Sequence, residues 1–433
     1  MISDLKFCSL TGGFGLKQEL VATVTVLLLI LSASPGSFLE KDICAETTIQ
    51  PNKAREASTS QIEKNPPGIA PVEIQTLPLP QAIKKEIGQT KLVTTVTCSK
   101  SSFNPSLDEE IALSYELKDD ATVTVHVYDP DNGLVKTLLE KVKQEAGKHT
   151  VVWDGCDLTG SVVPDEAYYF TIETEDLHGT QHIYDPTTFS GGESKDVLKS
   201  ELQPETQTVV YQMPEMGRVN IRIGTKGGPL LKTLVDWKPR VTGQITEYWN
   251  GMDEDNLMDL TRNPKSKMVI TYFTLPENTV ITYGNKTIGY RQYKQAVLVD
   301  KKRPQKPERP RVLKPKSPIS LHYTRPRTED YAPSINVTLP HVRETDDGVP
   351  VLKGRVLVRV ELGETESFLT EQRYEITFFL DGLFYAEDEA GYTPYNWVWD
   401  VTDVKAGEHI LTVNLSSFKD QIGVRSLKVK VVK

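Results

Sequence analysis

The chain repeats part of itself at an offset of 96 residues, and this repeat restricts its fold more than any other feature. Between positions 115 and 157 the two copies share 11 of 43 residues without a gap. Both contain a Trp-x-Gly-x-Asp motif, formed by Trp153, Gly155 and Asp157 in the first copy and by Trp249, Gly251 and Asp253 in the second. A period of about 100 residues is the length of a domain, so the sequence predicts a duplicated domain rather than a solenoid.

Short segments inside the repeat alternate between apolar and polar residues. Residues 122–129, 149–155 and 167–174 follow this pattern, and each segment is bounded by Asp, Asn, Gly or Pro. An alternation with a period of two is typical of half-buried strands joined by turns. The 28 Gly and 27 Pro residues fit the many turns that such a fold needs. We therefore predict an all-β chain.

The first copy resembles the immunoglobulin-like module of the FlgD type, which is named for the flagellar hook-capping protein. The matching elements are Phe103-Asn104-Pro105, Tyr128-Asp129, residues 134–138, Ala146-Gly147, Trp153-Asp154-Gly155 and Val163-Pro164. The family usually has Gly where this chain has Glu166. In the second copy Asn250 replaces the motif's Asp154, so its assignment to the same fold depends mainly on the repeat. The resemblance implies immunoglobulin-like β-sandwiches and no single activity.

A third unit follows the two copies. It contains the alternating segments 354–362, 373–382, 409–415 and 425–433. Its Phe-x-Asp-Gly strand and the following residues 394–413 resemble a different bacterial Ig-like module. The predicted fold class is therefore all-β, with tandem immunoglobulin-like β-sandwiches and a disordered N-terminal region. The predicted units are a signal peptide or N-terminal anchor (1–36), a disordered tether (37–91), sandwich 1 (92–182), the divergent sandwich 2 (200–298), a basic Pro-rich linker (299–332) and the C-terminal sandwich (333–433).

The N-terminus contains a twelve-residue apolar run from Leu20 to Leu31, preceded by Lys6 and Lys17 and followed by small residues. This run is shorter than the roughly 20 apolar residues that span a bilayer, so we expect a cleaved secretory signal, with an uncleaved anchor as the alternative. The predicted location is the periplasm, the cell surface or the extracellular space.

Removal of the signal would leave three of the four cysteines, because Cys8 would be lost with it. Cys98 and Cys156 lie within one predicted sandwich and are the first candidates for a disulfide. Cys44 paired with either of them is the alternative, because spacing alone does not choose between these pairings.

Residues 301–327 carry ten Lys or Arg against one Glu and are rich in proline. The net charge of −9 for the whole chain therefore hides a basic segment of +9. This composition predicts a semi-extended linker, with binding to an anionic surface as the alternative. Nothing in the pattern points to a specific nucleic acid.

The segment "VWDGCD" (152–157) has the composition of an active site, but no Ser/His/Asp or Cys/His set accompanies it. We interpret its Trp as core and its Asp-Gly as a turn. The acidic turns at 129–132 and 253–255 lack the spacing of an EF-hand, and the seven histidines lack zinc-ligand spacing. The aromatic residues of 384–399 are interpreted as core, with a carbohydrate platform as the competing hypothesis. No catalytic residue, metal or cofactor is predicted.

The sequence therefore favours a non-enzymatic exported protein that presents Ig-like modules to a protein or polysaccharide of the cell envelope or the extracellular space. Three alternatives remain: a polysaccharide-binding accessory protein, a scaffold like that of flagellar-hook assembly, and a hydrolase whose site only the fold assembles.

Overall fold

The computed structural model describes residues 92–197, 199–299, 319–363, 369 and 373–433. The predictions for the signal or anchor, the tether, Cys44 and residues 301–318 lie outside this range. Strands make up 55% of the structure and helices 7%, which confirms the all-β prediction. No helix among the described residues is long and apolar enough to span a membrane.

The first sandwich packs a three-stranded sheet against a larger sheet. The smaller sheet has the order β1 (Val93–Cys98), β3 (Ile111–Leu117), β6 (Gly147–Trp153). The larger sheet has the order β2 (Ser102–Phe103), β16 (Val280–Thr282), β7 (Ala167–Asp176), β4 (Ala121–Tyr128), β5 (Leu134–Gln144), and β8 (Gln181–Tyr184) also pairs with β7. Alternate residues of β3 are buried, as the period-two pattern requires.

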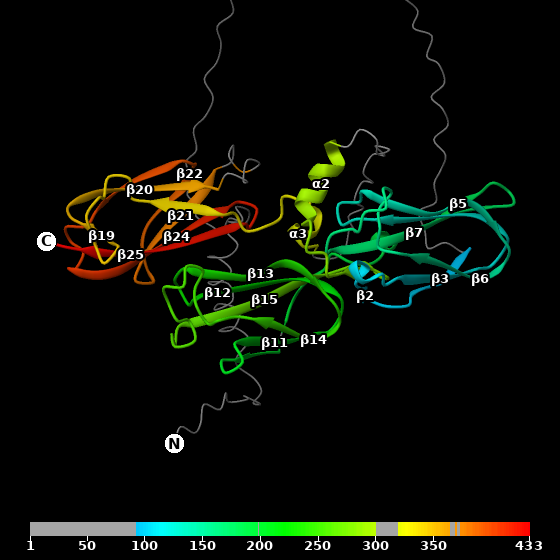
Figure 1. Cartoon of the computed structure of the whole chain (residues 1–433), viewed down its shortest axis with the longest axis horizontal. Helices are drawn as coiled ribbons and strands as arrows, with labels where there is room; N and C mark the ends of the chain where they lie inside the picture. The colour runs from blue at the N-terminus through cyan, green and yellow to red at the C-terminus, as the bar shows by residue number, and fades with distance from the viewer. Residues whose placement is uncertain (1–91, 198, 300–318, 364–368, 370–372) are drawn as a thin grey trace, which may run out of the picture. The chain divides into compact units, whose positions relative to one another are not determined.

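The second sandwich repeats this plan. One sheet has the order β10 (Ser200–Gln203), β11 (Thr208–Met213), β14 (Gly243–Tyr248). The other has the order β13 (Leu230–Arg240), β12 (Gly217–Thr225), β15 (Ser266–Thr274), β9 (Ser194–Asp196), and Figure 1 shows β12, β13 and β15 together in it. An offset of 96 residues carries β5 onto the bounds of β13, and β3, β4 and β6 onto β11, β12 and β14 to within one residue at each end.

The third sandwich has a sheet of order β17 (Ile335–Thr338), β20 (Arg355–Leu362), β23 (Tyr395–Asp400). Its second sheet has the order β18 (Thr345–Asp346), β19 (Val349–Leu352), β25 (Ile422–Val431), β24 (Gly407–Ser417), β21 (Tyr374–Leu380), β22 (Leu383–Gly391). A separate apolar cluster fills the space between the two sheets.

The strand pairing differs from the predicted boundary between the first two sandwiches. The predicted range of the second sandwich, 200–298, includes strand β16, but this strand pairs with β2 and β7 of the first sandwich. Val280, on this strand, is fully buried in the first core. The second sandwich is therefore inserted between β8 and β16 of the first.

Between β16 and the third sandwich, the described residues include two helices, α2 (Tyr290–Val299) and α3 (Leu321–Thr324). Ile319 forms an isolated antiparallel bridge with Glu193, just before β9 of the second sandwich. The described part of the predicted linker therefore makes specific contacts with the folded units.

Candidate functional site: a buried polar junction

Trp153 fills the core of the first sandwich. It is 1% exposed, and its ring lies edge-to-face against the rings of Phe103, Tyr168 and Phe170 at centroid distances of 5.6, 5.3 and 5.9 Å. Its indole Nε1 donates a hydrogen bond to the carbonyl of Cys156 at 2.9 Å. The tryptophan of "VWDGCD" therefore packs and closes a turn, and it offers no exposed ring face to a ligand.

The same turn occurs in the second sandwich. Trp249 is 4% exposed, and its Nε1 donates to the carbonyl of Met252 at 2.9 Å. Gly155 and Gly251 occupy the corresponding left-handed positions, with φ of 70° and 81°. A Cβ at Gly155 would also collide with Pro105, so glycine is required there for two reasons.

Asp157 and Asp253 complete these turns as hydrogen-bond acceptors. Oδ1 of Asp157 accepts from the amides of Thr159 and Ser161 at 2.8 and 3.1 Å. Oδ1 of Asp253 accepts from two later amides in the same way. The other oxygen of Asp157 accepts from the hydroxyl of Tyr293 on α2 at 3.1 Å. The aspartate of the motif therefore also attaches α2 to the first sandwich.

The predicted Cys98–Cys156 disulfide is absent, since both cysteines are free thiols. Cys98 is opposite Leu113 on β3, and Leu113 is opposite Val151 on β6. Two strand spacings therefore separate Cys98 from Val151, which places their Cα atoms about 10 Å apart. Cys156 lies five residues beyond Val151, past the end of β6. A disulfide needs Cα atoms within about 7 Å. Burial raises the pKa of the Cys98 thiol to about 12, which makes it unreactive.

The acidic turn at 129–132 is occupied by groups of the chain itself. Oδ1 of Asp129 accepts from the amides of Asp131 and Gly133, and Oδ2 pairs with Nζ of Lys294 on α2 at 2.9 Å. Tyr290, also on α2, donates its hydroxyl to Asp131 at 2.9 Å. No cluster of three or more metal-ligating side chains occurs among the described residues. The turn anchors α2.

Replacing Lys294 with methionine tests this anchor. Burial raises the pKa of Asp129 to about 6, and the charge of Lys294 opposes that rise. Because the pKa of Asp129 is higher in the folded protein than in the unfolded chain, the free energy of unfolding falls as pH rises through that pKa. Loss of Lys294 raises the pKa of Asp129 further, so the free energy of unfolding continues to fall at higher pH. We expect Lys294→Met to cost about 2 kcal/mol at pH 8 and less at pH 5, measured by urea unfolding. Lys232→Met, which removes a surface pair with Glu254, is the control and should show no such pH difference.

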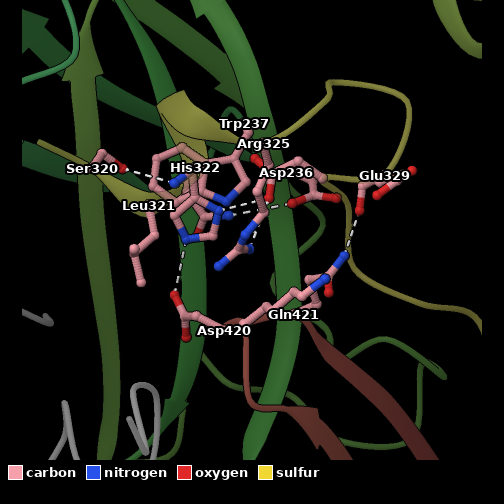
Figure 2. Close-up of polar contacts among 12 residues, drawn as sticks. Asp236, Trp237, Ser320, Leu321, His322, Arg325, Glu329, Asp420 and Gln421 are labelled. Atoms are coloured by element: carbon pink, nitrogen blue, oxygen red, sulfur yellow. Dashed lines mark hydrogen bonds and ion pairs between the residues drawn. The ribbon is translucent and has the colours of Figure 1, made fainter. Parts of the chain in front are cut away.

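The segment after Ile319 carries a buried histidine, His322, that lies among charged residues. Ser320 caps α3 by accepting from the amide of His322. The imidazole of His322 is 7% exposed and stacks on Trp237 of β13 with ring centroids 4.0 Å apart. Its Nδ1 lies 2.8 Å from Oδ1 of Asp330, and its Nε2 lies 3.1 Å from Oδ2 of Asp420, which belongs to the β24–β25 loop (Figure 2).

Arginines pair with the same carboxylates. Arg222 of β12 lies 3.1 Å from Asp420, and Arg325 lies 3.1 Å from Asp330. Burial alone would lower the pKa of His322, but its hydrogen bonds to Asp330 and Asp420 and their charges outweigh burial and raise it. Burial would raise the pKa of Asp420, but the charge of Arg222 and the contact with His322 lower it. Both shifts favour the charged forms of His322 and Asp420.

A second set of charges joins the first two sandwiches to this segment. Glu166, just before β7, is 3% exposed and lies 2.6 Å from Arg218 of β12. Its other oxygen lies 3.5 Å from Nε of Arg327. The amide of Arg327 donates to Asp131 at 2.6 Å, and the amide of Ala332 donates to Asp236 of β13 at 2.6 Å. Residues 319–332 are therefore tied to both sandwiches.

We call this set the polar junction; it consists of Glu166, Arg218, Arg222, Asp236, His322, Arg325, Arg327, Asp330 and Asp420. Arg325 and Arg327 belong to the basic segment for which binding to an anionic surface is the alternative prediction, but both are paired inside the junction. That hypothesis now depends on residues 301–318, outside the described range.

The polar junction lacks the arrangement of a hydrolytic site. The hydroxyl oxygen of Ser320 accepts from the backbone amide of His322, so it serves as the cap of α3. With a carboxylate at each ring nitrogen, the protonated imidazole donates twice and in that form has no lone pair for general-base work. A cavity of about 40 Å³ adjoins the junction, large enough for a few waters and bordered by Arg218 and Arg327, both already paired with Glu166.

The aromatic residues of 384–399 divide between the core and the surface: Trp399 is buried and Trp397 partly buried, whereas Phe384, Tyr385 and Tyr392 are 56%, 38% and 67% exposed. Trp399 is fully buried, and Trp397 is stacked between Phe378, at 4.2 Å, and Trp399, at 5.6 Å. Tyr385 lies edge-on to both tryptophans. The two tryptophans therefore contact other rings of the protein, and a carbohydrate platform remains the competing hypothesis for the exposed Phe384 and Tyr392.

The sequence contained one signal for the junction. Glu166 is the position at which the first copy departs from the glycine usual in the FlgD-type family, and it is the residue that pairs with two arginines. His322, Asp330 and Asp420 gave no signal, because His322 and Asp420 are 98 residues apart, and His322 and Asp330, which are eight residues apart, form no recognisable motif.

Comparison with known proteins agrees with the motifs of the first sandwich. The FlgD Ig-like domain family model matches residues 101–177. The basal-body rod modification protein FlgD of Salmonella typhimurium is 33% identical over 98 residues, which are 22% of this chain and 41% of that protein. The chain therefore spans less than half the length of this relative.

Two solved structures are also similar. FlgD of P. aeruginosa is 25% identical, with a TM-score of 0.18, over 20% of this chain and 67% of that one. The fibronectin(III)-like modules of Clostridium thermocellum CbhA are 11% identical, with a TM-score of 0.18, over 78% of this chain and 94% of theirs. At these TM-scores the fold assignment rests on the strand topology described above. The family match and the strand topology together confirm that residues 101–177 carry an FlgD-type immunoglobulin-like module.

Proposed function

We propose that this chain is a non-enzymatic, exported structural and interaction protein that presents its Ig-like modules to a protein or polysaccharide of the cell envelope or the extracellular space. The observation that carries the proposal is the FlgD-type module over residues 101–177, a fold used for structure and recognition rather than catalysis. The paired charges of the polar junction support it, because they hold modules together and leave no free base.

We further propose that the second sandwich is a divergent copy of the FlgD-type module. The strand bounds at an offset of 96 residues support a duplication, as do the matching Trp-x-Gly-x-Asp turns. Repeated modules on one chain supply several surfaces for a partner.

Export is tested with the full chain carrying a C-terminal tag, expressed in a bacterial host and followed by cell fractionation and N-terminal sequencing. We expect the protein outside the cytoplasm, beginning near residues 33–37. Leu27→Arg, which places a charge in the apolar run, should be retained in the cytoplasm. A wild-type protein that stays in the cytoplasm and begins at Met1 would contradict export, whereas intact protein in the membrane fraction would select the anchor.

Partner binding is tested by placing a photo-crosslinking residue at Tyr248 on β14, which is 68% exposed. We expect one defined crosslinked species in intact cells that the same residue at buried Trp249 does not give. Equal crosslinking at both positions would show that no specific surface is presented.

A further inference from the structure

His322 bridges two carboxylates with its two ring nitrogens. Nδ1 lies 2.8 Å from Asp330, and Nε2 lies 3.1 Å from Asp420. An ionised carboxylate only accepts hydrogen bonds, so both nitrogens must donate, and only the imidazolium has two N–H groups. The observed arrangement therefore requires a proton that a neutral histidine lacks.

Charged groups face this imidazole from each element packed against it. Asp330 and Arg325 come from the segment after α3, and Asp420 comes from the β24–β25 loop. Arg222 comes from β12 and pairs with Asp420. On β13, Trp237 supplies the stacked ring and Asp236 accepts from the amide of Ala332. The two arginines lie beside the carboxylates and disfavour a third positive charge, so the imidazolium depends on its two hydrogen bonds.

We propose that His322 is a pH-responsive clasp, which in its protonated form holds the β24–β25 loop of the third sandwich against residues 319–332 and releases that loop when it loses its proton. The clasp regulates a contact between modules and does not depend on where the protein resides.

The bond to Asp420 is the one that breaks. The side chain of Asp330 is 2% exposed and, without His322, would have only Arg325 to offset its burial, whereas that of Asp420 is 23% exposed and can turn to water or stay with Arg222. Neutral His322 therefore keeps its donor toward Asp330 and presents a lone pair to Asp420. The lone pair on Nε2 of neutral His322 and the ionised carboxylate of Asp420 repel each other at hydrogen-bond distance.

The direction of the response follows from the raised pKa of His322. A group whose pKa is higher in the folded protein contributes its full stabilisation of the fold below its pKa in the unfolded chain, which is 6.5 for histidine. This contribution is lost as pH rises through the pKa of the group in the folded protein. Asp420, whose pKa is lowered, stays ionised throughout this range. The clasp is therefore closed in mildly acidic solution and opens on the alkaline side.

Hydrogen–deuterium exchange of the full chain between pH 5.5 and 9.5, corrected for the intrinsic pH dependence of exchange, tests the clasp. The informative amides are those of Asp420 and Gln421, which donate within the β24–β25 loop. We expect the protection of these two amides from exchange to fall as pH rises, by about tenfold for each unit by which the pKa of His322 in the folded protein exceeds 6.5. The protection of the β4 amides in the first sandwich should stay constant.

Three variants make the result decisive. His322→Gln has no titrating group, so its loop protection should be lower and independent of pH. His409→Gln is the matched control, because His409 pairs with Asp381 inside the third sandwich, and it should keep the wild-type profile. Should His322→Gln fail to fold by circular dichroism, Asp420→Asn still decides, since losing one carboxylate should move the midpoint to lower pH. A flat wild-type profile, or one that these changes leave in place, overturns the proposal.

Discussion

Glu166→Gln is expected to lower the free energy of unfolding by about 3–5 kcal/mol, because it leaves two arginines without their carboxylate in a buried position. Glu166 is 3% exposed, and the side chain of Arg218 beside it is 4% exposed. Arg327, the second partner, is 17% exposed and can recover some hydration. Most of the loss therefore comes from Arg218, whose guanidinium stays enclosed when the charge of Glu166 is removed.

The measurement is urea unfolding of the full chain, followed by tryptophan fluorescence. Glu109→Gln is the matched control. Glu109 is likewise a carboxylate in an ion pair, with Lys100 at 3.2 Å, but both of these side chains are open to water. Its free energy of unfolding should match the wild type within error. Equal values for the two variants would show that the Glu166 pair does not stabilise the fold.

Trp153→Ala is expected to lower the free energy of unfolding by about 3–5 kcal/mol, because it opens a cavity in the core of the first sandwich. The side chain is 1% exposed and contacts three aromatic rings. Truncation also leaves the carbonyl of Cys156 without its indole donor. Calorimetry should therefore show a lower unfolding temperature for the first sandwich.

The neighbouring residue provides the control for Trp153. Val152 lies on the same strand, β6, and is 51% exposed on the opposite face. Val152→Ala should change stability by less than about 0.5 kcal/mol. If Trp153→Ala had as small an effect, the tryptophan would not be the core residue that its contacts describe.

Much of the fold followed from local patterns in the sequence. Period-two alternation and the repeat predicted the strands of the first two sandwiches, because half-buried strands and tight turns have compositions that a short window can detect. The turn at Gly155 is one example: a positive φ and contact with Pro105 both require glycine. The same logic placed Trp153 in a core.

The remaining features depend on contacts between distant residues. Strand β16 has three residues, too few for a period, and its place in the first sandwich is set by pairing with β7, more than 100 residues earlier. The disulfide prediction was wrong for a similar reason, since membership of one sandwich does not fix the register that separates Cys98 from Cys156. His322 and Asp420 are 98 residues apart, and neither lies in a recognisable motif.

The return of the chain to the first sandwich at β16 determines how the protein would carry a mechanical load. A pull between β1 and the third sandwich enters the first sandwich at one end and leaves it through β16, which β2 and β7 hold by strand pairing. While that pairing lasts, the backbone of the second sandwich, between β8 and β16, forms a closed side branch that bears no tension along its own length. A stretching force must therefore break the pairing of β16 with β2 and β7 before it can pull the backbone of the second sandwich straight.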